Sequence, residues 1–98
     1  MRLIYHQDAE AELVEAASFY ERRIPALGRE FIEAVDAAVA MIQETPDRWR
    51  VVDGGVRIFV MRRFPYGIHY RLLGGEIRIL ALKHHSRHPD YWRYRLGD

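Results

Sequence analysis

The first half of the chain repeats apolar positions with the period of a helix. One apolar stripe consists of Ala9, Leu13, Ala16, Ala17, Tyr20 and Ile24, and a second consists of Phe31, Ala34, Val35, Ala38, Met41 and Ile42. Asp8 is the expected N-cap of the first helix, and Pro25 and Gly28 mark a tight connection. The second helix is expected from about Arg29 to Glu44, since Pro46 disfavours helix before it. The two stripes predict a helical hairpin that buries one shared core.

The remaining apolar positions alternate with the period of a strand. A short strand is expected at Arg2 to His6, and three more follow Asp53-Gly54-Gly55. In the first of these, Val56, Ile58 and Val60 alternate with Arg57, Phe59 and Met61, and in the second, Tyr66, Ile68, Tyr70 and Leu72 alternate with Gly67, His69 and Arg71. Gly74-Gly75 predicts a hairpin turn, and Ile77 to Leu82 is apolar on both faces except at Arg78, as an interior strand requires. The β-α-α-β-β-β order predicts an α+β fold, with the helices on one face of a mainly antiparallel four-stranded sheet.

Length and composition limit the class of protein. The 98 residues are expected to form one domain, residues 1–98, and the absence of cysteine excludes disulfides and thiolate metal sites. No apolar run approaches the roughly 20 residues of a membrane span, and the N-terminus lacks the core of a signal peptide. We therefore expect a cytoplasmic protein that uses no membrane and no cofactor.

Charge is distributed unevenly along the chain. Residues 1–50 hold six Arg against ten acids, whereas residues 51–98 hold eight Arg and one Lys against four acids. Positive charge and aromatic rings are concentrated between Lys83 and Arg95, which contains one Lys, three Arg, three His, three aromatic residues and a single acid. Such a segment is costly to bury but suits contact with an anionic or aromatic partner. The acids Glu10, Glu12, Glu15 and Glu21 are expected on a solvated helix face.

Three stretches of sequence together resemble the RelE/ParE superfamily, the toxins of type II toxin–antitoxin modules. They are Phe64-Pro65-Tyr66-x-Ile68-x-Tyr70-Arg71, Ile77-x-Ile79-Leu80-Ala81-Leu82-Lys83-His84 and Arg87-x-Pro89-x-Tyr91-Trp92-x-x-Arg95. The order of elements also resembles theirs over nearly the whole chain. The ending is more similar to the ParE-like, or plasmid stabilisation, branch than to the ribosome-dependent RNases.

The resemblance implies a growth-inhibiting toxin that a cognate antitoxin protein neutralises, with operator DNA reached only through the antitoxin. It implies either of two targets, DNA gyrase for ParE-like proteins or mRNA on the ribosome for RelE-like ones. The RNases tend to carry Lys and Arg where this chain has Ile58, Val60 and Gly67, although Tyr91 and Arg87 match residues they use. The hypothesis is therefore a ParE-like inhibitor that binds its target. The alternatives are an mRNA endonuclease and a non-toxic member that only binds its antitoxin.

Candidate site residues follow from these hypotheses. An RNase requires a base, for which His84 or His85 is suited, and an acid, for which Tyr91 qualifies if neighbouring arginines lower its pKa. Arg78 and Arg87 are then expected to hold the phosphate. The alternative is that the two histidines merely end a strand, while Tyr91 and Trp92 fold back as core. The histidine spacing suits a helix that Pro89 forbids, so no metal site is expected.

The second half also predicts a binding surface. Arg57, Arg63, His69 and Arg71 are expected on the sheet face opposite the helices, where they would form a basic surface for RNA or for an acidic partner. The alternative is an ordinary solvated sheet face. The residues expected to contact a target or phosphate are Arg57, Arg63, Arg71, Arg78, Arg93 and Arg95. The antitoxin is expected to lay an extended or helical segment over the groove between helices and sheet and over this basic face.

Overall fold

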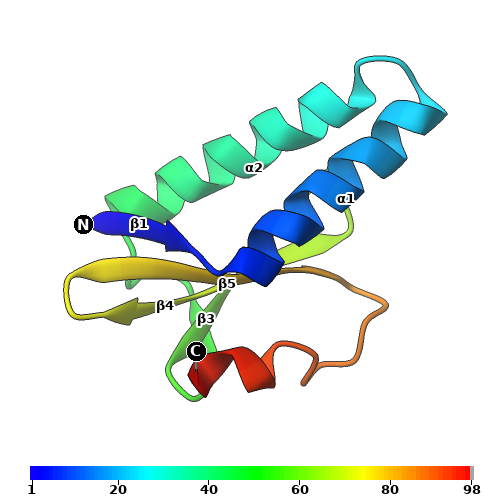
Figure 1. Ribbon diagram of the computed structural model, residues 1–98. Helices are drawn as coiled ribbons and strands as arrows, with labels where there is room; N and C mark the ends of the chain where they lie inside the picture. The colour runs from blue at the N-terminus through cyan, green and yellow to red at the C-terminus, as the bar shows by residue number, and fades with distance from the viewer. Residues whose placement is uncertain (98) are drawn as a thin grey trace.

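Two helices lie on one face of a mixed sheet, and a short C-terminal helix lies on the other (Figure 1). This computed structural model describes residues 1–97. The elements are β1 (Arg2–Tyr5), α1 (Gln7–Arg23), α2 (Leu27–Glu44), β2 (Arg50–Asp53), β3 (Val56–Val60), β4 (Tyr66–Leu73), β5 (Glu76–His84) and the 3₁₀ helix η1 (Arg93–Gly97). The predicted α+β class, with a helical hairpin on a mainly antiparallel sheet, is confirmed.

The sheet has five strands in the order β1-β5-β4-β3-β2, not the four that were predicted. Strand β1 runs parallel to β5, and the other pairs are antiparallel. The unpredicted strand is β2, whose residues are all exposed and therefore show no alternation of apolar and polar positions. It pairs with β3 through a turn at Gly54 and Gly55, which both have positive φ. The interior position predicted for β5 is confirmed, because β1 and β4 flank it.

The helix ends are closed by residues that the sequence did not single out. His6, not Asp8, caps α1, and its Nδ1 accepts a hydrogen bond of 3.0 Å from the Asp8 backbone N–H. Helix α2 begins at Leu27, earlier than expected, because the Glu21 carboxylate accepts from the backbone N–H groups of Ala26 and Gly28. These bonds lower the pKa of Glu21. Glu21 is therefore a capping residue and not part of a purely solvated helix face.

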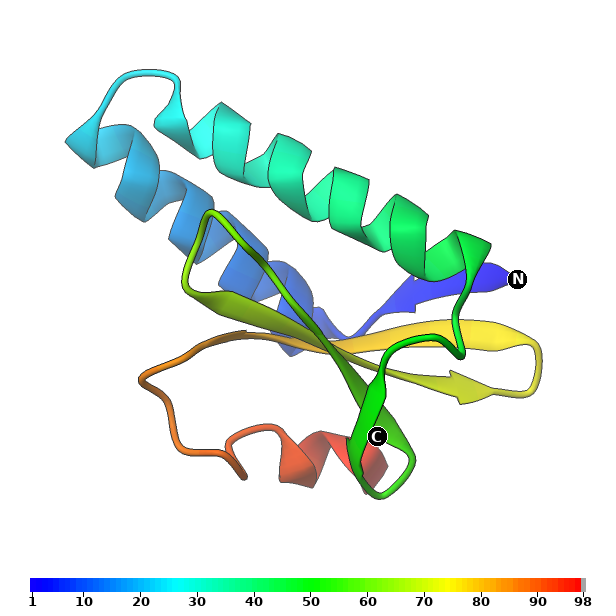
Figure 2. The same cartoon turned by 180° about the vertical axis from the view of Figure 1, so that it is seen from behind.

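Aromatic rings fill much of the core between the helices and the sheet. The β3–β4 connection turns towards the helices (Figure 2) and places Phe64 against Phe31, with ring centroids 5.0 Å apart in an edge-to-face arrangement. Tyr20 lies 5.0 Å from the same Phe64 ring. Tyr70 is buried and donates a hydrogen bond of 2.6 Å from its hydroxyl to the Pro46 carbonyl. These contacts join both helices to the loop and the central strand.

Strand β3 presents to the helices the face opposite to the one predicted. Phe59 and Met61 belong to the core beneath the helices, whereas Val56 packs on the other side of the sheet. The Trp49 ring, which precedes β2, lies 4.5 Å from the Phe59 ring and keeps Phe59 on the helix side of the sheet. The alternation of β3 was therefore predicted correctly, but the face assigned to the helices was the wrong one. Aromatic contacts outweigh the smaller area of the valines.

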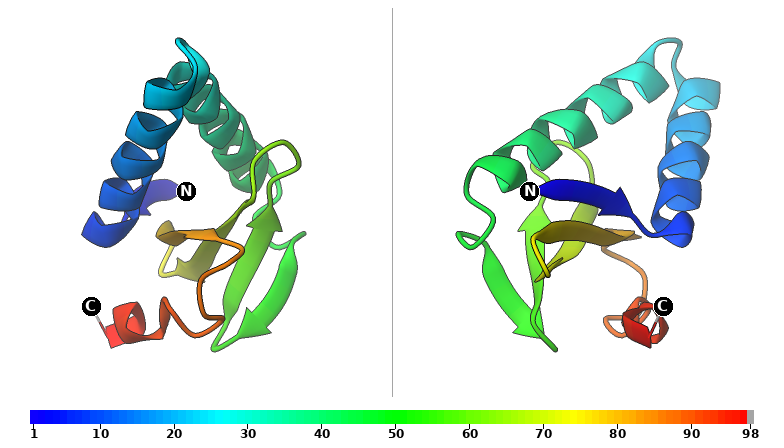
Figure 3. Two further views of the ribbon diagram at one scale, coloured as in Figure 1. Left: turned by 90° about the vertical axis from the view of Figure 1, so that its right-hand side faces the viewer. Right: turned by 60° about the vertical axis from the view of Figure 1, so that its left-hand side comes forward.

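The face away from the helices carries a second, smaller core. Tyr70 pairs with Ile79 and His69 with Ala81, so Leu80 is an extra residue in β5 and forms a β-bulge. Leu80 and Ala81 pack with Val56 and Trp92, which is almost fully buried. The C-terminal segment thus crosses this face of the sheet (Figure 3), as the alternative in which Trp92 folds back required.

Candidate functional site

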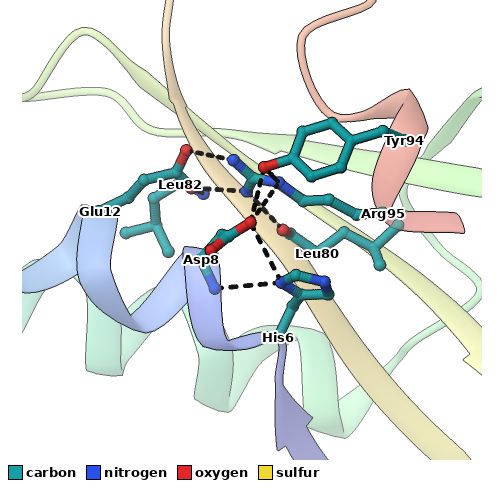
Figure 4. Close-up of polar contacts among 7 residues, drawn as sticks. All are labelled: His6, Asp8, Glu12, Leu80, Leu82, Tyr94 and Arg95. Atoms are coloured by element: carbon teal, nitrogen blue, oxygen red, sulfur yellow. Dashed lines mark hydrogen bonds and ion pairs between the residues drawn. The ribbon is translucent and has the colours of Figure 1, made fainter. Parts of the chain in front are cut away.

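The C-terminal segment is fixed to the sheet by a buried ion pair. Arg95 is 1% exposed, and its guanidinium donates hydrogen bonds of 2.9 and 2.8 Å to the two carboxylate oxygens of Glu12 on α1 (Figure 4). The same guanidinium donates to the Leu80 carbonyl at 2.8 Å, and Glu12 also accepts from the Leu82 backbone N–H at 3.0 Å. We call these two side chains and the two β5 backbone groups the Arg95 cluster. This bidentate arrangement pairs the Arg95 guanidinium fully with the Glu12 carboxylate.

Further polar contacts extend the Arg95 cluster to the start of α1. The Tyr94 hydroxyl donates to the Asp8 carboxylate at 2.6 Å and accepts from Arg95 Nε at 3.1 Å. Both Asp8 and the cap residue His6 lie beside this contact (Figure 4). The hydrogen bond to Asp8 raises the pKa of Tyr94. Arg95 was predicted to contact a target, and its burial contradicts that prediction.

The other predicted target-binding arginines mostly have intramolecular partners. Arg63 pairs with Glu30 on α2, Arg78 with Glu76, and Arg93 with both Asp53 and Asp90. Arg57 donates to the carbonyls of Asp47 and Trp49, and Arg71 donates to the Leu96 carbonyl.

The expected basic face opposite the helices is therefore not formed. Arg57 lies on the helix side, because β3 is turned over relative to the prediction, and Arg63 is tied to α2. Only His69 and Arg71, of the four residues placed there, lie on the far face, and the C-terminal segment reaches both.

Three of the four candidate catalytic residues share one cleft. His84, Arg87 and Tyr91 line a cleft with a volume of about 460 Å³ between α1 and the end of β5, together with Tyr66. The His84 ring lies edge-on to Tyr66 at 5.2 Å, and the Arg87 guanidinium lies 5.4 Å from the Tyr91 ring. His85 lies elsewhere, because consecutive strand residues point to opposite faces.

The acid expected for RNA cleavage has the wrong environment. A hydrogen bond with Glu12, together with burial, raises the pKa of Tyr91. An acid role required neighbouring arginines to lower this pKa, but Glu12 and burial outweigh the lowering effect of Arg95. Arg87 is exposed, and no carboxylate of residues 1–97 pairs with it. The raised pKa of Tyr91 is opposite to the lowered pKa that an acid role required.

A second surface is an apolar groove between α2 and β3, in the region between helices and sheet where the antitoxin was expected. Its volume is about 770 Å³, and its lining includes Met41, which is 42% exposed, and Val60, which is 52% exposed. Its lining also includes Ala34, Ala37, Ala38, Trp49, Phe59, Met61, Arg48, Arg50, Arg62 and Arg63. We call this surface the α2–β3 groove. Met41 and Val60 had been assigned to the core, and both are exposed.

Arginines surround the α2–β3 groove and leave it positively charged. Arg48, Arg50 and Arg62 have no carboxylate partner within the described residues, whereas Arg63 is neutralised by Glu30. The Arg48 guanidinium stacks 4.7 Å from the Trp49 ring, which keeps its charge at the mouth. An apolar floor with a basic rim matches an amphipathic segment that carries acids.

Residues 1–97 contain no group of three or more His, Asp or Glu side chains placed to hold a metal ion. None of the helices in these residues is both long enough and apolar enough to cross a membrane.

His69 is expected to make folding sensitive to mild acid. Burial lowers its pKa from 6.5 to about 4. Between these two pH values His69 is protonated in the unfolded chain but neutral in the folded protein. The free energy of unfolding therefore falls as pH falls, by about 1.4 kcal/mol per pH unit and about 3 kcal/mol in all. Urea denaturation at pH 7 and at pH 4.5 measures this loss. The control is His69→Phe, which should show a smaller loss. Equal losses in the two proteins would contradict the prediction, because the carboxylates titrate in both.

Comparison with known proteins identifies both a family and a fold. The family model for the ParE toxin of type II toxin–antitoxin systems, parDE, matches residues 3–89. Nine chains of solved structures match the chain significantly. One, described as the chromosomal ParDE TA system from P. aeruginosa, is 24% identical with a TM-score of 0.77, covering 86% of this chain and 95% of that one. No curated protein sequence matches significantly.

Proposed function

Because the chain belongs to the ParE toxin family of type II toxin–antitoxin systems, we propose that it inhibits growth by binding an essential cytoplasmic target, for which DNA gyrase is the candidate. The resemblance to the RelE/ParE superfamily is thereby confirmed. The environment of Tyr91 supports inhibition by binding. Glu12 and burial raise its pKa, which makes it a poorer proton donor. The non-ionisable residues Ile58, Val60 and Gly67 support the same reading, because they offer no charge to a phosphate.

The proposed contact with the target is the exposed segment from Ser86 to Asp90. Arg87 lies in it without an acidic partner in residues 1–97, and Arg93 binds Asp90 from the other side. The Arg95 cluster and the buried Trp92 hold the end of this segment against the sheet. A loop anchored on a rigid scaffold can present charge to a partner at a small cost in entropy.

The proposed contact with the antitoxin is the α2–β3 groove. Antitoxin segments of this kind are disordered when free and order on binding, so they require apolar area to offset the entropy of ordering. Met41 and Val60 offer such area, and the unpaired Arg48, Arg50 and Arg62 select an acidic segment. Strand β2 begins at Arg50 opposite Ile58 and does not pair with β3 beyond that residue, so an extended part of the antitoxin could also pair with the end of β3.

The proposed function is tested by inducing the chain in cells and finding the cause of any growth arrest. Induction of the chain is expected to arrest growth and to alter plasmid supercoiling before mRNA is degraded. Arg87→Ala should weaken the arrest, whereas Arg22→Ala, an exposed arginine on α1, should not. Tyr91→Phe should remain toxic, because the ring keeps its contacts. Cuts in mRNA mapped by primer extension, together with loss of toxicity in Tyr91→Phe, would establish the endonuclease instead.

The antitoxin is expected to be the product of the adjacent reading frame. Co-expression should suppress the arrest, and the two proteins should co-purify. Failure of every neighbouring product to co-purify would contradict the proposed module. Co-purification without any growth arrest by the free chain would instead indicate a member that only binds its antitoxin.

A further inference from the structure

Met41 is an oxidisable side chain in the lining of the α2–β3 groove. The chain contains three methionines and no cysteine, so no thiol of its own competes with methionine sulfur for an oxidant. Met41 is 42% exposed, whereas Met61, which lines the same groove, is 6% exposed. Met1 is also exposed, but it does not line the groove. An oxidant therefore reaches one methionine of the groove far more readily than the other.

The neighbours of Met41 make its thioether a main apolar contact of the groove. Ala37 and Ala38 lie four and three positions before it, so the three residues share one face of α2. Both alanines also line the groove. Because alanine side chains are short, Met41 is the largest side chain that α2 contributes to this surface. A segment that packs on α2 in the groove must therefore cover Met41.

Peroxide converts this thioether into a polar group. The Met41 sulfur attacks one oxygen of hydrogen peroxide, the O–O bond breaks, an S–O bond forms, and the other oxygen leaves as water with both protons. The sulfur loses two electrons and the peroxide gains them, so no further reactant is required. The resulting sulfoxide carries a strong hydrogen-bond acceptor where the thioether carried only a weak one. Burial of that acceptor against an apolar partner is costly.

Access of peroxide to Met41 depends on whether the groove is filled. Hydrogen peroxide is small and uncharged, so the charges of Arg48, Arg50 and Arg62 do not exclude it. A bound segment that packs on Met41 and Val60 excludes it by covering the sulfur. The free chain is then open to oxidation at this position, and the occupied chain is not.

We propose that Met41 is a peroxide-sensitive modification site, and that its oxidation prevents the antitoxin from occupying the α2–β3 groove. Because this groove is the proposed antitoxin contact, the effect on binding rests on that proposed function. A free chain that meets peroxide would resist later neutralisation, whereas a chain already bound would be protected. Methionine sulfoxide reductases restore the thioether, so the modification is reversible.

Peptide mapping after peroxide treatment tests the reactivity of Met41 in the isolated chain. Cleavage after arginine places Met41 in the peptide of residues 30–48 and Met61 in that of residues 58–62. Mass spectrometry should show one added oxygen on the first peptide at least about sevenfold faster than on the second, in line with the exposure of the two side chains. Circular dichroism establishes that the oxidised chain is folded. Equal rates in the two peptides would overturn the proposal.

Calorimetric titration with the purified product of the adjacent reading frame tests the effect on binding. Oxidation of Met41 should weaken the affinity about thirtyfold, as desolvation of one unpaired polar group does. Treatment with methionine sulfoxide reductase and dithiothreitol should restore the affinity. The matched control is Met41→Leu. Whatever the affinity of this variant, peroxide should not change it, because leucine has no sulfur and Met1 lies outside the groove.

Failure of the oxidation site is distinguishable from failure of the proposed function. Binding that peroxide leaves unchanged, although Met41 carries the added oxygen, would overturn the oxidation site alone. An equal loss in Met41→Leu would do the same, because another residue would then be the cause. No binding by the untreated chain would overturn the antitoxin contact, and the oxidation site with it. Oxidation of Met41 at the same rate in the complex as in the free chain would place the antitoxin outside the groove, with the same consequence.

Discussion

Replacement of Arg95 with alanine is expected to lower the free energy of unfolding by about 3–5 kcal/mol. The variant leaves the Glu12 carboxylate, which is mostly buried, without its counter-ion. It also removes the donor to the Leu80 carbonyl, so a buried backbone acceptor loses its partner. Urea denaturation, followed by the fluorescence of Trp92 and Trp49, measures the change.

Two further variants isolate the cause of this loss. Arg93→Ala removes an exposed arginine two positions away, and it should change stability only slightly, because exposed ion pairs contribute little. Joint replacement of Glu12 and Arg95 by leucine should recover part of the loss, since it leaves no unpaired buried charge. If Arg95→Ala costs no more than Arg93→Ala, the Arg95 cluster does not stabilise the fold.

Replacement of Met41 and Val60 together by glutamate is expected to weaken antitoxin binding about a thousandfold. Each substitution replaces apolar contact area with a carboxylate that the bound antitoxin would desolvate, at a cost of about 2 kcal/mol. A total of about 4 kcal/mol corresponds to a thousandfold change in affinity. The acids of the antitoxin would add repulsion. Calorimetric titration with the purified product of the adjacent reading frame measures the effect, and circular dichroism establishes that the variant is folded.

The matched control for this experiment is Val14→Glu. Val14 is a strongly exposed apolar residue on α1, outside the groove. It should leave the affinity within about twofold of the original, as a surface change away from an interface does. A loss below tenfold in the double variant, or an equal loss in Val14→Glu, would place the antitoxin elsewhere. In cells, the double variant should remain toxic even when the antitoxin is present.

The helices, the fold class and the faces of β4 could be predicted because their signals are local. The apolar stripe through Phe31 and Val35 lies within one helix, and the alternation of Ile68 with His69 lies within one strand. The face that β3 turns towards the helices could not be predicted, because it depends on the contact of Phe59 with Trp49, the residue before β2. Both alternating sets in β3 contain large apolar residues, so the pattern alone does not select a face.

The candidate site was harder to predict, because its central contact is non-local. Glu12 and Arg95 are 83 positions apart, and each was assigned to solvent or to a target because charged residues are usually exposed. That His84 and His85 lie on opposite faces of the sheet could be predicted, since neighbouring residues in a strand face opposite sides. The bulge at Leu80 brings its carbonyl to Arg95, and nothing in the apolar sequence of β5 predicts this bulge.

The Arg95 cluster also bears on self-association. Strand β1 pairs with β5 only as far as Ile79, so the outer edge of β5 beyond that point would otherwise offer bare backbone groups to any passing strand. Glu12 occupies the Leu82 N–H and Arg95 occupies the Leu80 carbonyl. Two side chains thus replace the missing strand and close this edge against edge-to-edge aggregation. Arg95→Ala reopens the edge, so we expect its purified form to aggregate through intermolecular β-pairing at concentrations where the original chain stays monomeric.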